Sequence, residues 1–131
     1  PHHHPTIRRQ RQMCIRDREP VDIYKSKKTK NFLKKQINKI FKKSNIYNEV
    51  ILAYEPLWSI GTGLTPKMSE INDILQFLTK ILKNYSFKKI KILYGGSVNL
   101  SNIKEILSLQ KLDGVLVGSA STKPSFIKYF K

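Results

Sequence analysis

The chain has 131 residues, 40% of them apolar, which is enough to bury the core of one ordinary domain or part of a larger one. No apolar run approaches the ~18 residues that a membrane span needs, and a single cysteine cannot form an internal disulfide. The sequence therefore excludes a helical membrane protein and a disulfide-stapled secreted scaffold. The formal net charge of +16 suggests, taken alone, an anionic partner such as nucleic acid.

The basic residues are unevenly distributed along the chain. All five arginines, all three histidines and Cys14 lie in the first 18 residues, whereas all twenty lysines lie at Lys25 or later. One protein under one codon bias rarely changes its basic residue so abruptly. We therefore interpret residues 1–18 as a non-native or disordered leader, such as an appended tag, adaptor read-through or misassembled segment, and predict the fold from residues 19–131.

Residues 19–131 contain no histidine, cysteine or arginine. This composition excludes Ser-His-Asp and Cys-His catalysis and the usual zinc ligands, so we predict no metal site. It also excludes bidentate arginine–guanine contacts, the commonest specific contact with DNA bases. Lysine in place of arginine, together with many isoleucines and asparagines, fits an AT-rich genome and accounts for most of the charge.

The first predicted element is a helix over residues 25–43. Its apolar positions share one face, and its lysines occupy the other. A solvated outer surface is the preferred interpretation of that lysine face, and a surface for nucleic acid or an anionic membrane is the alternative. No aromatic residues are interleaved with these lysines for base stacking, which makes nucleic acid the weaker choice.

Three apolar runs predict strands, and each is followed by glycine. Residues 49–54 form a continuous apolar run typical of a strand buried on both faces, as in parallel sheets. Residues 89–94 and 114–117 predict two further strands. A helix that starts between Thr65 and Ser69 separates the first two strands, a short helix over 102–109 separates the next two, and Pro124 opens a terminal helix. The fold class is α/β, with three parallel strands alternating with helices, as in a slice of a larger sheet or barrel.

Glycines after the strands have a chemical meaning. Without side chains in the way, backbone N–H groups can converge on a phosphate or another oxyanion. In a closed βα barrel these loops gather at one mouth, where active sites lie. Glu55 lies at the same level, as a candidate base, although a strand-end carboxylate paired with a surface lysine is the simpler alternative.

Three motifs resemble the triosephosphate isomerase family in order and spacing. They are residues 53–63 (AYEPLWSIGTG), 94–99 (YGGSVN) and 113–121 (DGVLVGSAS). The resemblance implies that residues 19–131 are the C-terminal part of a (β/α)8 barrel, with strands six to eight. It also implies interconversion of dihydroxyacetone phosphate and glyceraldehyde 3-phosphate without a cofactor, in glycolysis and gluconeogenesis. The absence of a credible targeting segment favours the cytoplasm.

Site residues follow from the same resemblance. Glu55 is the carboxylate base that moves the proton. Backbone N–H groups that bind the substrate phosphate belong to Gly61, Ser97, Gly118 and Ser119. Residues of the mobile lid and its latch are Pro56, Trp58, Gly63 and Tyr94.

Two departures from the family pattern stand out. Gly118-Ser119 replaces a glycine pair, so Ser119 must accept the backbone conformation of that second glycine. The family also usually has an arginine that pairs with an acid at the position of Asp113, whereas Thr79 or Lys80 lies near that place here.

The family's histidine, lysine and asparagine, and its main dimer loop, belong to the first half of the barrel. We therefore expect a homodimer for the full-length family member and no significant activity for this chain alone. Two alternatives remain: a non-catalytic phosphate-binding half-barrel, and a basic nucleic-acid-binding protein.

Overall fold

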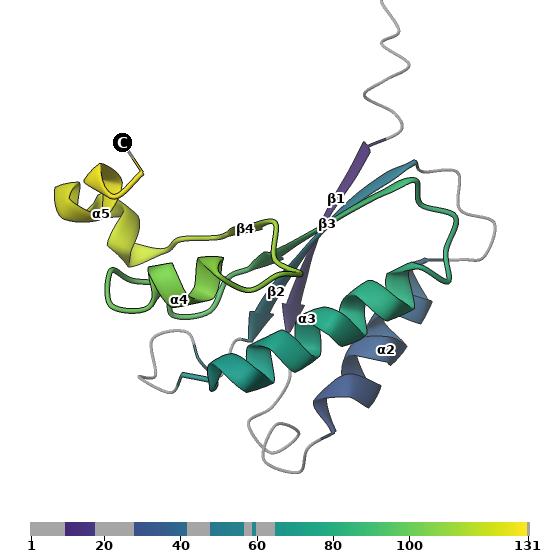
Figure 1. The fold of residues 1–131 in the computed structure, drawn as a ribbon. Coiled ribbons are helices and arrows are strands. Elements are labelled where there is room, and N and C mark those ends of the chain that lie inside the picture. Colours follow the sequence, from purple (N-terminus) through teal and green to yellow (C-terminus); the bar gives the residue numbers. More distant parts are fainter. Residues whose placement is uncertain (1–9, 18–27, 42–47, 57–58, 60–64, 131) are drawn as a thin grey trace, which may run out of the picture.

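The structure, a computed structural model, describes residues 10–17, 28–41, 48–56, 59 and 65–130. Its centre is a four-stranded sheet in the order β1-β2-β3-β4, with every neighbouring pair parallel (Figure 1). The strands are β1 (Gln10–Asp17), β2 (Glu49–Pro56), β3 (Lys89–Tyr94) and β4 (Gly114–Val115). Because all four run in one direction, their carboxyl ends lie at the same edge of the sheet. The predicted α/β class with parallel strands is confirmed.

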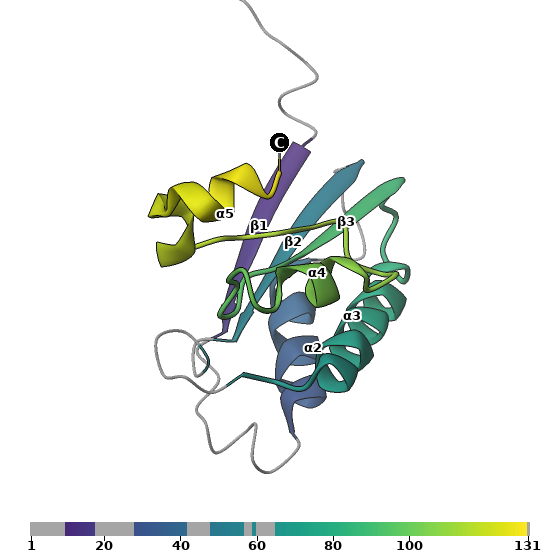
Figure 2. The same cartoon turned by 60° about the vertical axis from the view of Figure 1, so that its left-hand side comes forward.

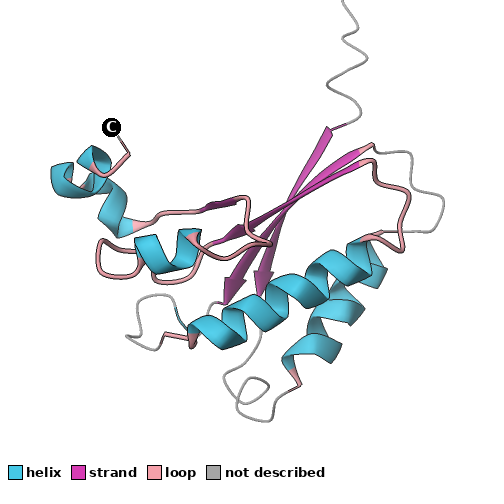
Figure 3. Ribbon diagram, in the orientation of Figure 1, coloured by secondary structure: helices cyan, strands magenta, loops and turns pink. Residues whose placement is uncertain are grey.

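Helices alternate with the strands along the chain (Figure 3). They are α2 (Thr29–Ile40), α3 (Met68–Leu82), α4 (Ile103–Leu107) and α5 (Pro124–Lys128), with a 3-10 helix η3 at Ser119–Thr122. The start of α3 falls inside the predicted window, and α5 begins at Pro124 as predicted. The carboxylate of Glu70 accepts a hydrogen bond from the Lys67 N–H at 2.9 Å, which satisfies a free amide at the start of α3.

Strand β4 is shorter than the predicted 114–117. Its last paired residue, Val115, lies opposite Tyr94, which is where β3 itself ends. No partner residue of β3 therefore remains to extend the ladder. The Leu116 N–H still donates to the Tyr94 carbonyl at 2.8 Å, so the chain leaves the sheet directly after that bond.

The core lies between the sheet and the helices α2 and α3, which cover one face of it (Figure 2). Alternate residues of β2, namely Val50, Leu52 and Tyr54, belong to this core. Helix α2 contributes Leu33 and Ile37, as its apolar spacing predicts. Odd positions of β2 project to the opposite face, because side chains alternate across a strand. That second face carries the Glu55 side chain.

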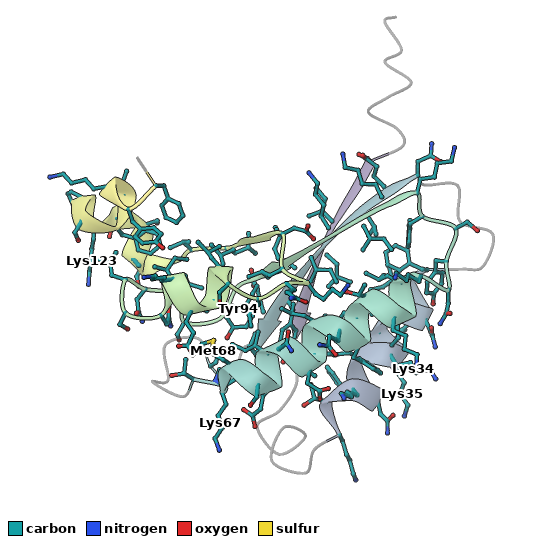
Figure 4. The ribbon with its side chains drawn as sticks, viewed as in Figure 1. Lys34, Lys35, Lys67, Met68, Tyr94 and Lys123 are labelled. Atoms are coloured by element: carbon teal, nitrogen blue, oxygen red, sulfur yellow. The ribbon has the colours of Figure 1, made fainter. Side chains whose placement is uncertain are left out.

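Lysines of α2 lie on its outer side, away from the sheet. Lys34 and Lys35 are exposed and point outward (Figure 4). Lys30 forms an ion pair with Asp73 of α3 at 2.6 Å. This arrangement fits the preferred interpretation of the lysine face as a solvated surface.

Strand β1 falls inside the segment that the sequence analysis assigns to a leader. The sequence predicts no strand there, but the structure pairs Gln10–Asp17 with β2, from Gln10 opposite Glu49 to Asp17 opposite Pro56. The expectation that all of 1–18 lies outside the fold is therefore wrong for these eight residues. Pairing along a strand edge uses backbone groups, which carry no side-chain pattern to recognise. The foreign origin of the segment stays a prediction.

Candidate active site

Glu55 lies at the carboxyl end of β2, half-buried, on the face of the sheet that α2 and α3 do not cover. Its side chain packs over Gly95, the residue that follows β3. A Cβ atom on Gly95 would lie 2.6 Å from Glu55 Cγ and 3.2 Å from Glu55 Oε1. The Gly95 N–H donates to the Tyr54 carbonyl at 2.9 Å, which holds the two strand ends together. Gly95 therefore leaves the space that the Glu55 side chain occupies.

Tyr94 points to the opposite side of the sheet and is fully buried (Figure 4). Burial raises the pKa of Tyr94 to about 12, and the Ser59 side chain partly offsets that rise. Among the described residues, the hydroxyl has no hydrogen-bond partner of standard geometry. A Cβ atom on Gly96 would lie 1.9 Å from this hydroxyl, so only glycine fits beside it. Because its pKa is raised, the Tyr94 hydroxyl keeps its proton at neutral pH.

Ser97 is held from two directions. Its Oγ donates to the Ser59 carbonyl at 2.6 Å, and its carbonyl accepts from Asn102 Nδ2 at 2.6 Å. Ser59 is buried, and its own Oγ donates to the Pro56 carbonyl at 2.9 Å. A chain of hydrogen bonds thus joins the residue after Glu55 to the loop after β3.

Neither Ser59 nor Asn102 is among the site residues that the sequence predicts. Ser59 lies inside the first motif, but nothing in its residue type marks it as a bridge. Asn102 precedes a short helix, where asparagine is common for local reasons. Both contacts depend on how two loops approach each other in space.

Gly118 and Ser119 follow β4 and are exposed. Gly118 has a φ of −88°, and a Cβ atom there would meet no described atom within 4 Å. Ser119 is the first residue of the 3-10 helix η3. Ser119 therefore has a helical backbone conformation, which serine adopts readily, so this position does not require glycine.

Asp113 stands at the entry to β4. Its Oδ2 accepts from the Ile92 N–H at 2.7 Å, and its own N–H donates to the Ile92 carbonyl at 2.9 Å. Thr79, near the expected arginine position, donates its hydroxyl to the Leu75 carbonyl of its own helix at 2.8 Å. The carboxylate of Asp113 is thus bonded to the main chain of β3.

The structure brings the described site residues to one edge of the sheet, at the ends of β2, β3 and β4. Trp58, Gly61 and Gly63 lie outside the described residues, whereas Pro56 is the buried last residue of β2. Over the described ranges, no three His, Cys, Asp or Glu side chains group in a way that could hold a metal ion. No helix there is long and apolar enough to cross a membrane.

The family profile described as "Triosephosphate isomerase" matches residues 10–131. The chain belongs to the triosephosphate isomerase family. The matched length covers the whole described sheet, and the family accounts for the α/β, barrel-like arrangement of parallel strands.

Curated relatives agree with that assignment. The chain is 46% identical over 114 residues to triosephosphate isomerase of Campylobacter jejuni, covering 86% of this chain and 47% of the relative. It is 37% identical over 113 residues to that of Neurospora crassa, covering 83% of this chain and 46% of the relative. It is 40% identical over 114 residues to that of Buchnera aphidicola, covering 83% and 44%. The chain therefore spans about half the length of the curated relatives it matches.

Proposed function

We propose that residues 19–131 supply the C-terminal part of a triosephosphate isomerase barrel, strands six to eight, and that Glu55 is its catalytic base. The observation that carries the proposal is the placement of the Glu55 side chain over Gly95. The carboxylate is half-buried at the carboxyl edge of the sheet, on the face that α2 and α3 do not cover. In barrels of this class, substrates bind at that edge.

In this proposal Glu55 takes a proton from the carbon next to the substrate carbonyl and returns it to the neighbouring carbon. The reaction interconverts dihydroxyacetone phosphate and glyceraldehyde 3-phosphate, and it needs no cofactor. A carboxylate becomes a stronger base when water leaves its surroundings. Residues 56–63, just after Glu55, supply the lid that excludes water.

The substrate phosphate binds backbone N–H groups of Ser97, Gly118 and Ser119, with Gly61 contributing from the lid. Two fixed bonds support the position of Ser97, one to the Ser59 carbonyl and one from Asn102. Tyr94 and Ser97 latch the closed lid. The Ser59 side chain, which belongs to the lid segment, lies close enough to the Tyr94 hydroxyl to offset part of the rise in its pKa that burial causes.

The chain by itself is not expected to turn over substrate. Residues 19–131 contain no histidine to act as the electrophile, and the relatives are about twice as long. The complete enzyme is expected to be a homodimer that works in glycolysis and gluconeogenesis in the cytoplasm. A nucleic-acid-binding protein is not favoured, because the match to an enzyme family covers nearly the whole chain.

A hybrid enzyme tests the proposal. Residues 19–131 replace the matched part of the Campylobacter jejuni relative, and isomerisation of glyceraldehyde 3-phosphate is measured. We expect turnover by the hybrid enzyme and a loss of about 10²–10⁴-fold in kcat for Glu55→Gln, which keeps the shape of the side chain but cannot accept the proton.

Glu105→Gln is the matched control, since Glu105 is an exposed carboxylate on α4. It should leave kcat unchanged. An active hybrid enzyme that tolerates Glu55→Gln equally well would contradict the role of Glu55. A folded but inactive hybrid enzyme would contradict the isomerase proposal itself.

A further inference from the structure

We propose that Asp113 is a positioning residue for the phosphate-binding loop, acting by holding β4 in register against β3. The inference rests on the proposed function, because that function is what gives Gly118 and Ser119 their role. It concerns a side chain that need not touch the substrate. Asp113 comes before β4, whereas Gly118 and Ser119 come after it.

The backbone ladder between β3 and β4 is very short. Strand β4 has two residues, Gly114 and Val115, which lie opposite Leu93 and Tyr94. The adjoining backbone bonds are Asp113 N–H to the Ile92 carbonyl at 2.9 Å and Leu116 N–H to the Tyr94 carbonyl at 2.8 Å. So short a ladder gives little resistance to fraying or slipping.

The Asp113 carboxylate adds another bond at the open end of this ladder. In a strand, the N–H and carbonyl of one residue point to the same side, so the Ile92 N–H faces β4 as its carbonyl does. A ladder carbonyl would ordinarily accept that N–H, but here Asp113 Oδ2 accepts it at 2.7 Å. A carboxylate forms a stronger bond to an N–H than a neutral carbonyl does. Asp113 therefore pairs with Ile92 through both its backbone and its side chain.

The register of β4 reaches both parts of the proposed site. Only Leu116 and Val117 separate the ladder from Gly118, so a shift of β4 moves the phosphate-binding N–H groups with it. Leu116 Cβ also lies 3.2 Å from the place where a Cβ of Gly95 would be. Gly95 is the residue that makes room for Glu55. The hydrogen bonds between Asp113 and Ile92 therefore act on Gly118 and Ser119 through the position of β4. They act on Glu55 through the contact of Leu116 with Gly95.

Thr79 does not share this task. Its hydroxyl donates to the Leu75 carbonyl within α3 at 2.8 Å. We therefore assign the positioning effect of Asp113 to its hydrogen bond with the Ile92 N–H.

The first measurement is hydrogen exchange of the Ile92 amide in the full 131-residue chain. We expect Asp113→Ala to speed this exchange at least tenfold and Asp113→Asn to speed it less, because the amide oxygen can still accept the bond. Glu105→Ala, which removes an exposed carboxylate from α4, should leave it unchanged. Unchanged exchange in Asp113→Ala would overturn the proposal. If that variant does not fold, unchanged exchange in Asp113→Leu, whose side chain has no acceptor, would overturn it.

The second measurement separates positioning from general stability. In the hybrid enzyme, Asp113→Ala should raise KM about tenfold while kcat falls less than threefold, with Asp113→Asn closer to the parent. A normal KM in a folded Asp113→Ala hybrid enzyme would overturn the positioning role. If the parent hybrid enzyme is inactive, the isomerase proposal fails by itself, and the Ile92 exchange still decides whether Asp113 holds β4.

Discussion

Glu55 and Gly95 occupy adjacent strand ends so closely that a single methyl group on Gly95 would lie 2.6 Å from Glu55 Cγ. The other atoms that such a methyl would approach are Glu55 Oε1 and Leu116 Cβ, each at 3.2 Å. The Glu55 side chain cannot keep its position when that space is filled. Position 95 therefore controls where the proposed base points.

Gly95→Ala is expected to lower kcat of the hybrid enzyme about 10²-fold, because a displacement of about 1 Å at a reacting group has that effect. Folding should be largely retained, since the Glu55 side chain is half-exposed and can swing away. Gly114→Ala is the matched control, because its Cβ would meet only a movable Leu93 methyl at 3.0 Å. Steady-state kinetics with circular dichroism would check both variants, and equal effects of the two would contradict the prediction.

Tyr94 should make the stability of the chain depend on alkaline pH. Burial raises its pKa from 10.0 to about 12, so the folded state retains the hydroxyl proton after the unfolded state has lost it. Stability is then complete below pH 10 and declines as the pH rises toward 12, by up to about 2–3 kcal/mol.

Tyr94→Phe removes this dependence, and it should flatten the fall in the free energy of unfolding between pH 10 and 12. Near pH 7 the same change should cost less than about 1 kcal/mol, because the hydroxyl has no standard partner among the described residues. Urea unfolding at several pH values measures both effects. An identical alkaline slope in the two proteins would count against the assignment to Tyr94.

Ser97→Ala should loosen the loop after β3. It removes the donor to the Ser59 carbonyl, and we expect a loss of about 1 kcal/mol in the free energy of unfolding of the full chain. In the hybrid enzyme the same variant should raise KM. Ser101→Ala is the control, because Ser101 is exposed and its hydroxyl donates to the exposed side chain of nearby Asn99, so its loss should change stability by less than about 0.5 kcal/mol.

The 131-residue chain should show no isomerase turnover above the buffer rate. A titration with inorganic phosphate, followed by NMR, then shows whether the chain alone forms a folded half-barrel that binds phosphate. Saturable shifts at the Ser97 and Ser119 amides with micromolar phosphate would favour the half-barrel alternative. Turnover near that of the Campylobacter jejuni relative would contradict the expectation that the chain needs the rest of the barrel.

Much of the architecture could be read from local patterns. Apolar spacing predicted the bounds of β3 and the start of α3, and proline chemistry predicted the start of α5. The three motifs after the strands identified the family. These features succeed because periodicity and turn residues report which face of a short segment is buried, whatever lies against it.

Other features arise only from contacts between distant segments. Strand β1 forms along the edge of β2, although its residues show no strand period. The Ser59 carbonyl accepts a hydrogen bond from the Ser97 hydroxyl in the neighbouring loop. The Asp113 carboxylate accepts one from the Ile92 N–H, 21 residues earlier in the chain.

The sequence by itself determined the succession of strands and helices, the family and the identity of Glu55 as the candidate base. Only the tertiary structure decided that Gly95 leaves space for the Glu55 side chain and that the Asp113 carboxylate accepts a hydrogen bond from Ile92, next to the β3–β4 ladder. Both relationships depend on the register between neighbouring strands. Register is set by packing across the whole sheet, and a local pattern of residue types cannot specify which atoms meet.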